Sequence, residues 1–165
     1  MNDQSAWEAL QQDFGDINLG RLMHVAVRLL FAAALGGALG YQREKVGKPA
    51  GMRTYMLVTV GAAFFVIVPQ LEGFGDDAMS RVLQGLITGI GFLGGGAIIK
   101  LTEKEEIKGL TTAAGIWLAA AIGIAVGFGR LGTAILATVI AYLILSVVFR
   151  LEQFLTAKDT DSEAQ

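Results

Sequence analysis

The sequence of 165 residues contains no cysteine, two prolines and a single histidine. Without cysteine the chain has neither disulfide bonds nor thiolate metal ligands. Catalytic patterns are also missing, because there is no nucleotide-binding glycine loop ending in Lys-Ser or Lys-Thr, no Ser/His/Asp set and no pair of catalytic carboxylates. We therefore expect a protein that is not an enzyme, with no catalytic residues, no cofactor and no metal site.

Charge is scarce as well, since only 17% of the residues are charged while 53% are apolar. The formal net charge of −2 argues against a nucleic-acid partner. A helix needs about 20 mostly apolar residues to cross a bilayer. Five stretches free of Asp and Glu approach that length: 22–40, 54–71, 82–101, 109–128 and 131–149. Because a carboxylate is costly in lipid, these stretches predict an all-α fold, an integral membrane bundle of about five transmembrane helices.

The chain is expected to have three parts. Residues 1–20 form an outer-face segment, whose apolar side chains recur at helical spacing from Trp7 to Ile17 after an S-x-x-E capping box that begins at Ser5. This pattern predicts a short interfacial helix, with a partly ordered tail as the alternative. Residues 21–150 form the transmembrane domain, and residues 151–165 form a short cytoplasmic tail.

The orientation follows from the basic residues of the connections, which favour the cytoplasmic side. Nine of them fall on one side of the predicted bundle: Arg43, Lys45, Lys48, Arg53, Lys100, Lys104, Lys108, Arg150 and Lys158. Three fall on the other side: Arg21, Arg81 and Arg130. We therefore predict that the N-terminus lies outside the cell and the C-terminus in the cytoplasm.

Three short motifs occur in a fixed order along the chain. They are GYQRE at 40–44 with AGMRT at 50–54, GIGFLGGG at 89–96, and GLTTAAGIW at 109–117. Together, over residues 22–129, they resemble the signature of the MgtC/SapB family of bacterial inner-membrane proteins. The resemblance implies a multi-pass protein of the inner (cytoplasmic) membrane. Many family members continue into a cytoplasmic domain, which we expect to be missing here because the chain ends 15 residues after Arg150.

The resemblance also implies a physiological role, because family members are linked to growth at low magnesium, survival inside host cells (virulence) and acid stress. We expect a non-enzymatic protein of stress adaptation that binds a membrane partner: an anionic lipid, another membrane protein or further copies of itself. A small transporter or channel for an anion or another solute is the alternative. A cation transporter is less favoured, since it would be expected to carry a carboxylate within its spans.

Glycines recur at a spacing of four residues, which places them on one face of a helix. The pairs are Gly36/Gly40, Gly85/Gly89, Gly91/Gly95 and Gly123/Gly127. Small residues let helix backbones approach closely in lipid. We therefore expect these glycines to pack helices together, and one such face to join the chain into a homo-oligomer. A substrate path lined by bare backbone is the alternative.

Two further features concern repeats and intramembrane charge. An ungapped offset of 58 residues aligns Gly51 with Gly109 and Thr54 with Thr112, which predicts a parallel repeat of two hairpins. Arg28 lies about two turns inside the first predicted span, and an intramembrane charge is a candidate functional group. The alternative is that Arg28 extends outward, towards Asp76 or Asp77, and anchors the bundle.

The predicted cytoplasmic side offers a candidate site for an anionic lipid headgroup or a phosphate group. Its members are basic residues and threonines near the starts of the second and fourth spans: Arg43, Lys48, Arg53, Thr54, Thr111 and Thr112. The threonines are expected to cap these helices, whose N-terminal amides and dipoles attract anions. Arginine binds phosphate through two parallel hydrogen bonds. The alternative is that the basic residues only set the topology, with Glu44 forming an ion pair with Arg43 or Arg53.

Overall fold

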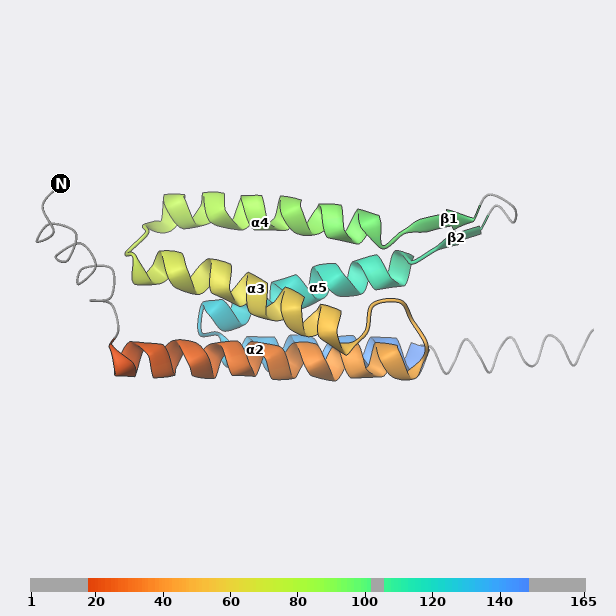
Figure 1. Cartoon of the computed structure of the whole chain (residues 1–165), viewed down its shortest axis with the longest axis horizontal. Coiled ribbons are helices and arrows are strands. Elements are labelled where there is room, and N and C mark those ends of the chain that lie inside the picture. The colour runs from red at the N-terminus through yellow and green to blue at the C-terminus, as the bar shows by residue number, and fades with distance from the viewer. Residues whose placement is uncertain (1–17, 102–105, 149–165) are drawn as a thin grey trace, which may run out of the picture.

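The computed structural model describes residues 18–101 and 106–148. In chain order the elements are α2 (Leu19–Lys45), α3 (Met52–Leu71), α4 (Asp76–Gly96), β1 (Ile99–Leu101), β2 (Glu106–Lys108), α5 (Leu110–Gly127), α6 (Leu131–Leu143) and the π-helical segment η1 (Ile144–Val148). The predicted all-α bundle is confirmed (Figure 1). The sequence did not predict the short antiparallel strands β1 and β2 between α4 and α5. The predicted interfacial helix and the tail at 151–165 lie outside the described residues, except that α2 already begins at Leu19.

Successive helices run in opposite directions, so the bundle has two ends (Figure 1). One of them, called the basic end below, carries the connection from α2 to α3, the β1–β2 hairpin and η1. The opposite end carries the turns from α3 to α4 and from α5 to α6. The hairpins α2–α3 and α4–α5 therefore point the same way, as the predicted repeat requires. Its aligned glycines, Gly51 and Gly109, are the N-cap residues of α3 and α5.

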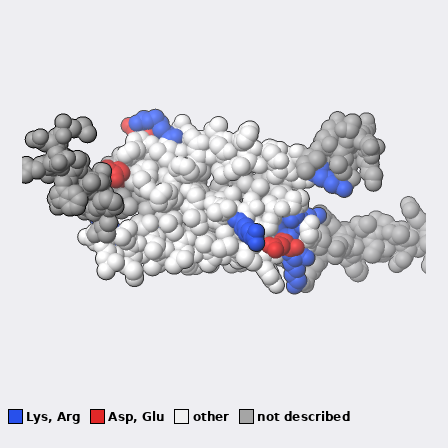
Figure 2. All heavy atoms as spheres, in the orientation of Figure 1, with Lys and Arg blue, Asp and Glu red and all other residues white. Residues whose placement is uncertain are grey.

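Three of the helices, α2, α3 and α5, are long and apolar enough to span a membrane. The helix α4 has 21 residues, but Asp77, Arg81 and Gln84 make its first half more polar. The apolar helix Leu131–Val147 is shorter than the other spans. Figure 2 shows the charged atoms towards the two ends of the face in view, with other residues between them. Large apolar side chains on the outside, such as Phe92 at 84% exposure, fit a surface that faces lipid.

Alanines and glycines make up much of the interior of the bundle, beside a few large side chains such as Tyr55. α5 and α3 are the most buried of the three long apolar helices, and Ala63 and Ala119 are completely buried within them. α2 packs against α3, where the Thr59 hydroxyl donates to the Ala32 carbonyl at 2.8 Å. α4 lies at the edge of this core. The result is a tight group of α2, α3 and α5 with α4 as a peripheral helix.

The glycine pairs predicted from the sequence divide into two groups. Four glycines lie in close contacts between helices: Gly36, Gly40, Gly123 and Gly127. A Cβ atom at Gly127, for example, would lie 2.7 Å from Cβ of Val66 on α3. Four others, all on α4, have no atom within 4 Å of such a Cβ: Gly85, Gly89, Gly91 and Gly95. Only the first group packs helices together within the described chain.

Candidate functional site

A buried arginine lies at the basic end of the bundle. Arg43 is in the last turn of α2 and is only 4% exposed. Its Nη2 donates a hydrogen bond of 2.8 Å to Oγ1 of Thr112 in the first turn of α5. The guanidinium also lies close enough to the Tyr55 hydroxyl for an electrostatic interaction. The Nε atom, however, has no hydrogen-bond partner.

Unpartnered polar atoms concentrate around this arginine. Among the described residues, the buried side-chain atoms without a hydrogen bond are Nε of Arg43, Oε1 of Gln42 and the hydroxyl oxygen of Tyr55. All of them belong to the last turn of α2 or the first turns of α3. A buried group of this kind calls for an explanation, and an ion that is bound in the functional state is one.

No carboxylate in the described part of the chain compensates the charge of Arg43. Its polar contacts are the two hydroxyls of Thr112 and Tyr55. Removing a guanidinium from water costs several kcal/mol, and neutral hydroxyls offset only part of that cost. The geometry therefore favours an anion as the missing partner.

A cavity of about 390 Å³ lies beside Thr112, between α3, α4 and α5. We call it the basic-end pocket. Thr54 of α3 and Thr112 of α5 line it together with apolar residues that include Phe92 and Leu93. A threonine hydroxyl has one proton to donate and accepts through its lone pairs. Because the Thr112 oxygen already accepts from Arg43, the hydroxyl proton is the group that Thr112 can offer to a further partner.

The predicted caps of α3 and α5 are wrong. These helices begin at Met52 and Leu110, after the N-cap residues Gly51 and Gly109, so the threonines lie inside the first turn. Gly109 has a φ of 98°, a left-handed conformation that glycine adopts without strain. A Cβ at this position would also collide with the carbonyl oxygen of Ala97. The tight turn after β2 thus sets the start of α5.

The helix N-termini differ in their access to a ligand. Oε2 of Glu44 accepts a hydrogen bond of 3.1 Å from the Met52 amide, so a carboxylate of the chain itself already lies at the start of α3. At the start of α5, no side chain of the described residues is found to cap the helix in this way. The ion pair predicted between Glu44 and Arg43 or Arg53 is not formed, because Arg43 binds Thr112 and Arg53 has no polar partner among the described residues.

The remaining members of the predicted site lie at the surface of the basic end. Lys48, Arg53 and Thr111 are exposed, whereas Arg43 and Thr112 are buried. Thr112 therefore links Arg43, through a hydrogen bond, to the exposed Thr54, with which it lines one pocket. Within residues 18–101 and 106–148, no group of three His, Asp or Glu side chains is placed to hold a metal ion.

Sequence reasoning missed Tyr55, which directly follows the motif AGMRT, and Gln42, which lies within GYQRE. Tyr55 is completely buried, and a Cβ at Gly115 of α5 would collide with its hydroxyl. Nε2 of Gln42 donates to the Leu145 carbonyl at 2.9 Å, within η1. π-Helical segments are frequent at functional sites. The available signal was a run of polar residues at the end of an otherwise apolar span.

Arg28 has a structural partner at the opposite end. Its Nη1 donates to the carbonyl of Gly127 at 3.0 Å, the last residue of α5. A cation at a helix C-terminus is stabilised by the exposed carbonyls and the helix dipole. Arg28 therefore ties α2 to the turn between α5 and α6, and its acceptor is this carbonyl rather than Asp76 or Asp77.

The comparisons with known proteins agree on one family. The MgtC family model matches residues 29–154. The chain is 40% identical over 145 residues to "Protein SrpB" of Synechococcus elongatus, covering 81% of this chain and 80% of SrpB. It is 41% identical over 133 residues to "Putative magnesium transporter YhiD" of Escherichia coli, covering 76% of this chain and 60% of YhiD. It is also 41% identical over 134 residues to "Protein MgtC" of Brucella abortus, covering 81% of this chain and 55% of MgtC.

These relatives differ in how much of their length the chain covers. It spans four fifths of SrpB, 60% of YhiD and 55% of the Brucella protein. No solved structure matches the chain. The family model covers well over half of the sequence, including the four motif segments and the buried Arg43. With its three long apolar helices, this membrane protein belongs to the MgtC family.

Proposed function

We propose that the protein is a non-enzymatic protein of the bacterial inner membrane that binds a phosphate-bearing anionic group, carried by a membrane lipid, in the basic-end pocket. The observation that carries the proposal is the burial of Arg43 without a carboxylate partner. A phosphate in the pocket would accept the Thr112 proton and offset the charge of the guanidinium behind it. Charge-assisted hydrogen bonds of this kind are the strong ones.

The orientation of the bundle supports a lipid of the cytoplasmic leaflet. Lys48, Arg53 and Lys108 surround the basic end in addition to Arg43. Basic residues near the membrane surface attract anionic lipids of the cytoplasmic leaflet. The proposed topology, with the N-terminus outside and the C-terminus in the cytoplasm, places the pocket at this leaflet. Adaptation to low magnesium or to acid is the proposed setting, because both conditions change the charge balance of the membrane surface.

Transport is the second candidate function, favoured by the name that YhiD carries. Magnesium prefers carboxylate and other oxygen ligands, and the five apolar stretches of this sequence contain no Asp or Glu. That composition favours lipid binding over a magnesium path. A flux measurement on the protein in liposomes, with magnesium and phosphate as the tested ions, separates the candidates. Flux above that of empty liposomes would establish transport.

Self-association is also proposed, through the exposed face of α4 that carries Gly91 and Gly95. Both glycines are exposed and meet no atom within 4 Å. Gln84 and Thr88 lie on the same face of α4 and are exposed too. Small and hydrogen-bonding side chains are enriched where helices associate in lipid. A second copy of the chain is the proposed partner of this face.

The lipid proposal is tested by comparing Arg43→Gln with Arg53→Gln. Native mass spectrometry of the purified chain would measure retained phosphatidylglycerol, with phosphatidylethanolamine as the zwitterionic reference. Loss of a charge-assisted hydrogen bond of about 1.5–3 kcal/mol corresponds to a roughly 10- to 100-fold weaker retention in Arg43→Gln. Arg53→Gln removes an exposed charge and should have a smaller effect. Equal retention by wild type and Arg43→Gln would overturn the proposal.

A further inference from the structure

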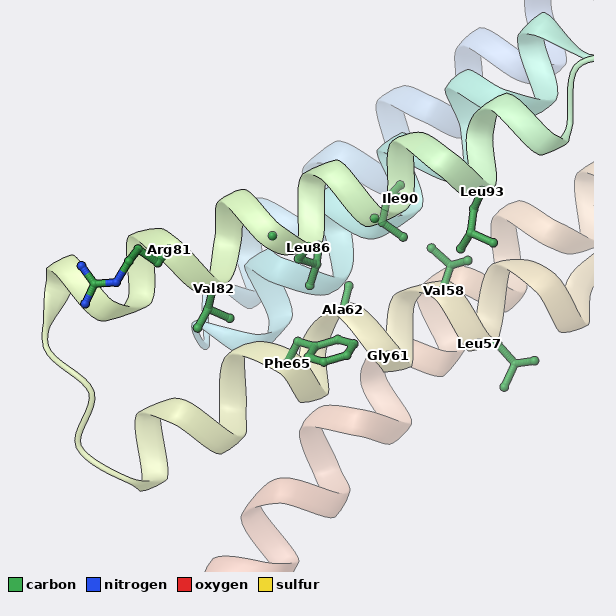
Figure 3. Close-up of a pocket in the computed structure, with 12 residues that line it drawn as sticks. Leu57, Val58, Gly61, Ala62, Phe65, Arg81, Val82, Leu86, Ile90 and Leu93 are labelled. Atoms are coloured by element: carbon green, nitrogen blue, oxygen red, sulfur yellow. The ribbon is translucent and has the colours of Figure 1, made fainter.

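A second and larger cavity lies between α3 and α4 (Figure 3). It is an open groove of about 650 Å³, and apart from Arg81 its lining consists of apolar residues and glycines. Phe65 of α3 and Leu86 of α4 contribute side chains on the two sides of this groove. Arg81 lies at the end remote from the basic end. We call this cavity the α3–α4 groove.

The α3–α4 groove adjoins the basic-end pocket. Val58 of α3 and Leu93 of α4 line both cavities, and their side chains face each other in Figure 3. One of these adjoining parts has the hydroxyls of Thr54 and Thr112, with Arg43 behind Thr112. The other part is an apolar arm that is open to the membrane.

The dimensions of the groove match an acyl chain. Its lining on α4 runs from Arg81 to Leu93, which covers about 18 Å at the rise of an α-helix. The hydrocarbon of one leaflet is about 15 Å thick, half of the bilayer core. A chain that fills one leaflet therefore fits along the groove.

Three glycines create the volume of the groove. Gly61, Gly85 and Gly89 line it, and an added Cβ at any of them would meet no atom within 4 Å. No contact within the described chain requires glycine at these positions, in contrast to Gly36 and Gly127. Larger side chains would fit without collision, but they would occupy the space that a ligand needs.

On the basis of the function proposed above, we infer that the ligand is an anionic phospholipid of the cytoplasmic leaflet whose phosphate lies in the basic-end pocket and one of whose acyl chains lies in the α3–α4 groove. The polar end provides hydroxyl donors beside a buried cation, and a free phosphate ion would leave the apolar arm unfilled. A lipid with a negative headgroup and a long chain is therefore the occupant of both cavities.

The test fills the groove and leaves the polar end intact. In the double variant Gly85→Leu/Gly89→Leu the new side chains project into the groove, and the full chain is otherwise unchanged. Gly132→Leu on α6 is the matched control, because Gly132 also meets no atom within 4 Å and does not line the groove. The probes are long-chain phosphatidylglycerol, glycerophosphoglycerol (the same headgroup without chains) and inorganic phosphate. Retention is measured by native mass spectrometry.

The inference predicts a loss that depends on the chain. Retention of long-chain phosphatidylglycerol should fall about tenfold in the double variant, because overpacking removes the space for the chain. It should be unchanged in Gly132→Leu, and wild type should retain the long-chain lipid better than either probe without a chain. Equal retention of long-chain lipid by the double variant and wild type would overturn the inference but not the proposed function.

The remaining outcomes are also decisive. If wild type binds inorganic phosphate or glycerophosphoglycerol as well as it binds the lipid, the groove has no role and the inference fails while an anion site stands. If Arg43→Gln retains the long-chain lipid fully, the proposed function fails with it. If Arg81→Gln, rather than Arg43→Gln, loses the lipid, the headgroup lies at the opposite mouth of the groove and the inference is overturned.

Discussion

Replacing Arg43 by methionine tests whether the charge of Arg43 serves to bind a ligand or to stabilise the fold. The variant loses the hydrogen bond from Nη2 to Thr112, worth about 1.5–3 kcal/mol for a charged donor. It also removes a guanidinium that is 4% exposed and has an unpartnered Nε, and keeping such an ion from water costs several kcal/mol. Replacing buried ionic groups with apolar residues of similar volume is often neutral or stabilising by about 1–4 kcal/mol. We therefore expect the lipid-free variant to be at least as stable as wild type.

The assay is thermal unfolding in detergent, with and without added phosphatidylglycerol. Wild type should gain about 2.7 kcal/mol when the lipid is present at 100 times its dissociation constant. Arg43→Met should gain little or nothing, because the cation that the phosphate needs is absent. Arg53→Met is the control, since Arg53 is exposed. This control should keep both the stability and most of the lipid response of wild type.

One result would refute the reasoning directly. A loss of about 1.5–3 kcal/mol in lipid-free Arg43→Met is the cost expected when the hydrogen bond of a charged donor is removed and no desolvation gain offsets it. Such a loss, together with an unchanged response to lipid, would make Arg43 a structural residue whose hydroxyl contacts to Thr112 and Tyr55 suffice. The basic-end pocket would then need no anion.

Two further predictions concern the glycines and the topology. Gly91→Leu/Gly95→Leu should leave the subunit folded but abolish self-association in cross-linking and light-scattering measurements. Gly127→Leu should instead destabilise the bundle by at least about 1–3 kcal/mol, because a Cβ atom at this position would lie 2.7 Å from Cβ of Val66. Assembly of the double variant like wild type would exclude that face as the interface. Because the chain has no cysteine, a single cysteine that replaces Lys48 or Glu72 can be labelled selectively. We expect a membrane-impermeant reagent added outside the cell to label position 72 and not position 48. Labelling of position 48 alone would mean that the topology is inverted.

The fold was largely predictable because apolar length is a strong signal. Four of the five predicted stretches begin within three residues of the first residue of the observed helix. A long apolar segment in lipid has to form a helix, because only a helix provides hydrogen bonds for all of its backbone groups within the segment. The predicted stretch 82–101 begins six residues later than α4 itself. The helix starts with a polar turn that contains Asp76 and Asp77, and this turn precedes the apolar part that the sequence pattern detects. Helix caps were less predictable. At Gly51 and Gly109 the chain geometry, rather than a capping side chain, sets the helix start.

The site was only partly predictable, because contacts between distant residues have no local pattern. Motif positions drew attention to Arg43, Thr54 and Thr112, and the offset of 58 residues paired the two threonines that line one pocket. The burial of Arg43 and its bond to Thr112, 69 residues away, required the folded arrangement. The roles of the glycines also required the folded arrangement. The same spacing of four residues occurs where helices pack closely, at Gly127, and where a groove is open, at Gly85.

The packing of α3 against α5 has a consequence for how the chain assembles during synthesis. α4 is made between these two helices, yet it buries only Met79 and Gly94 of its own residues. The face of α3 that finally meets Gly123 and Gly127 can therefore be covered by them only after α5 has been made. α4 has to remain aside during that interval, and its few internal contacts leave it free to do so. Insertion of α5 is thus the step that locks the subunit.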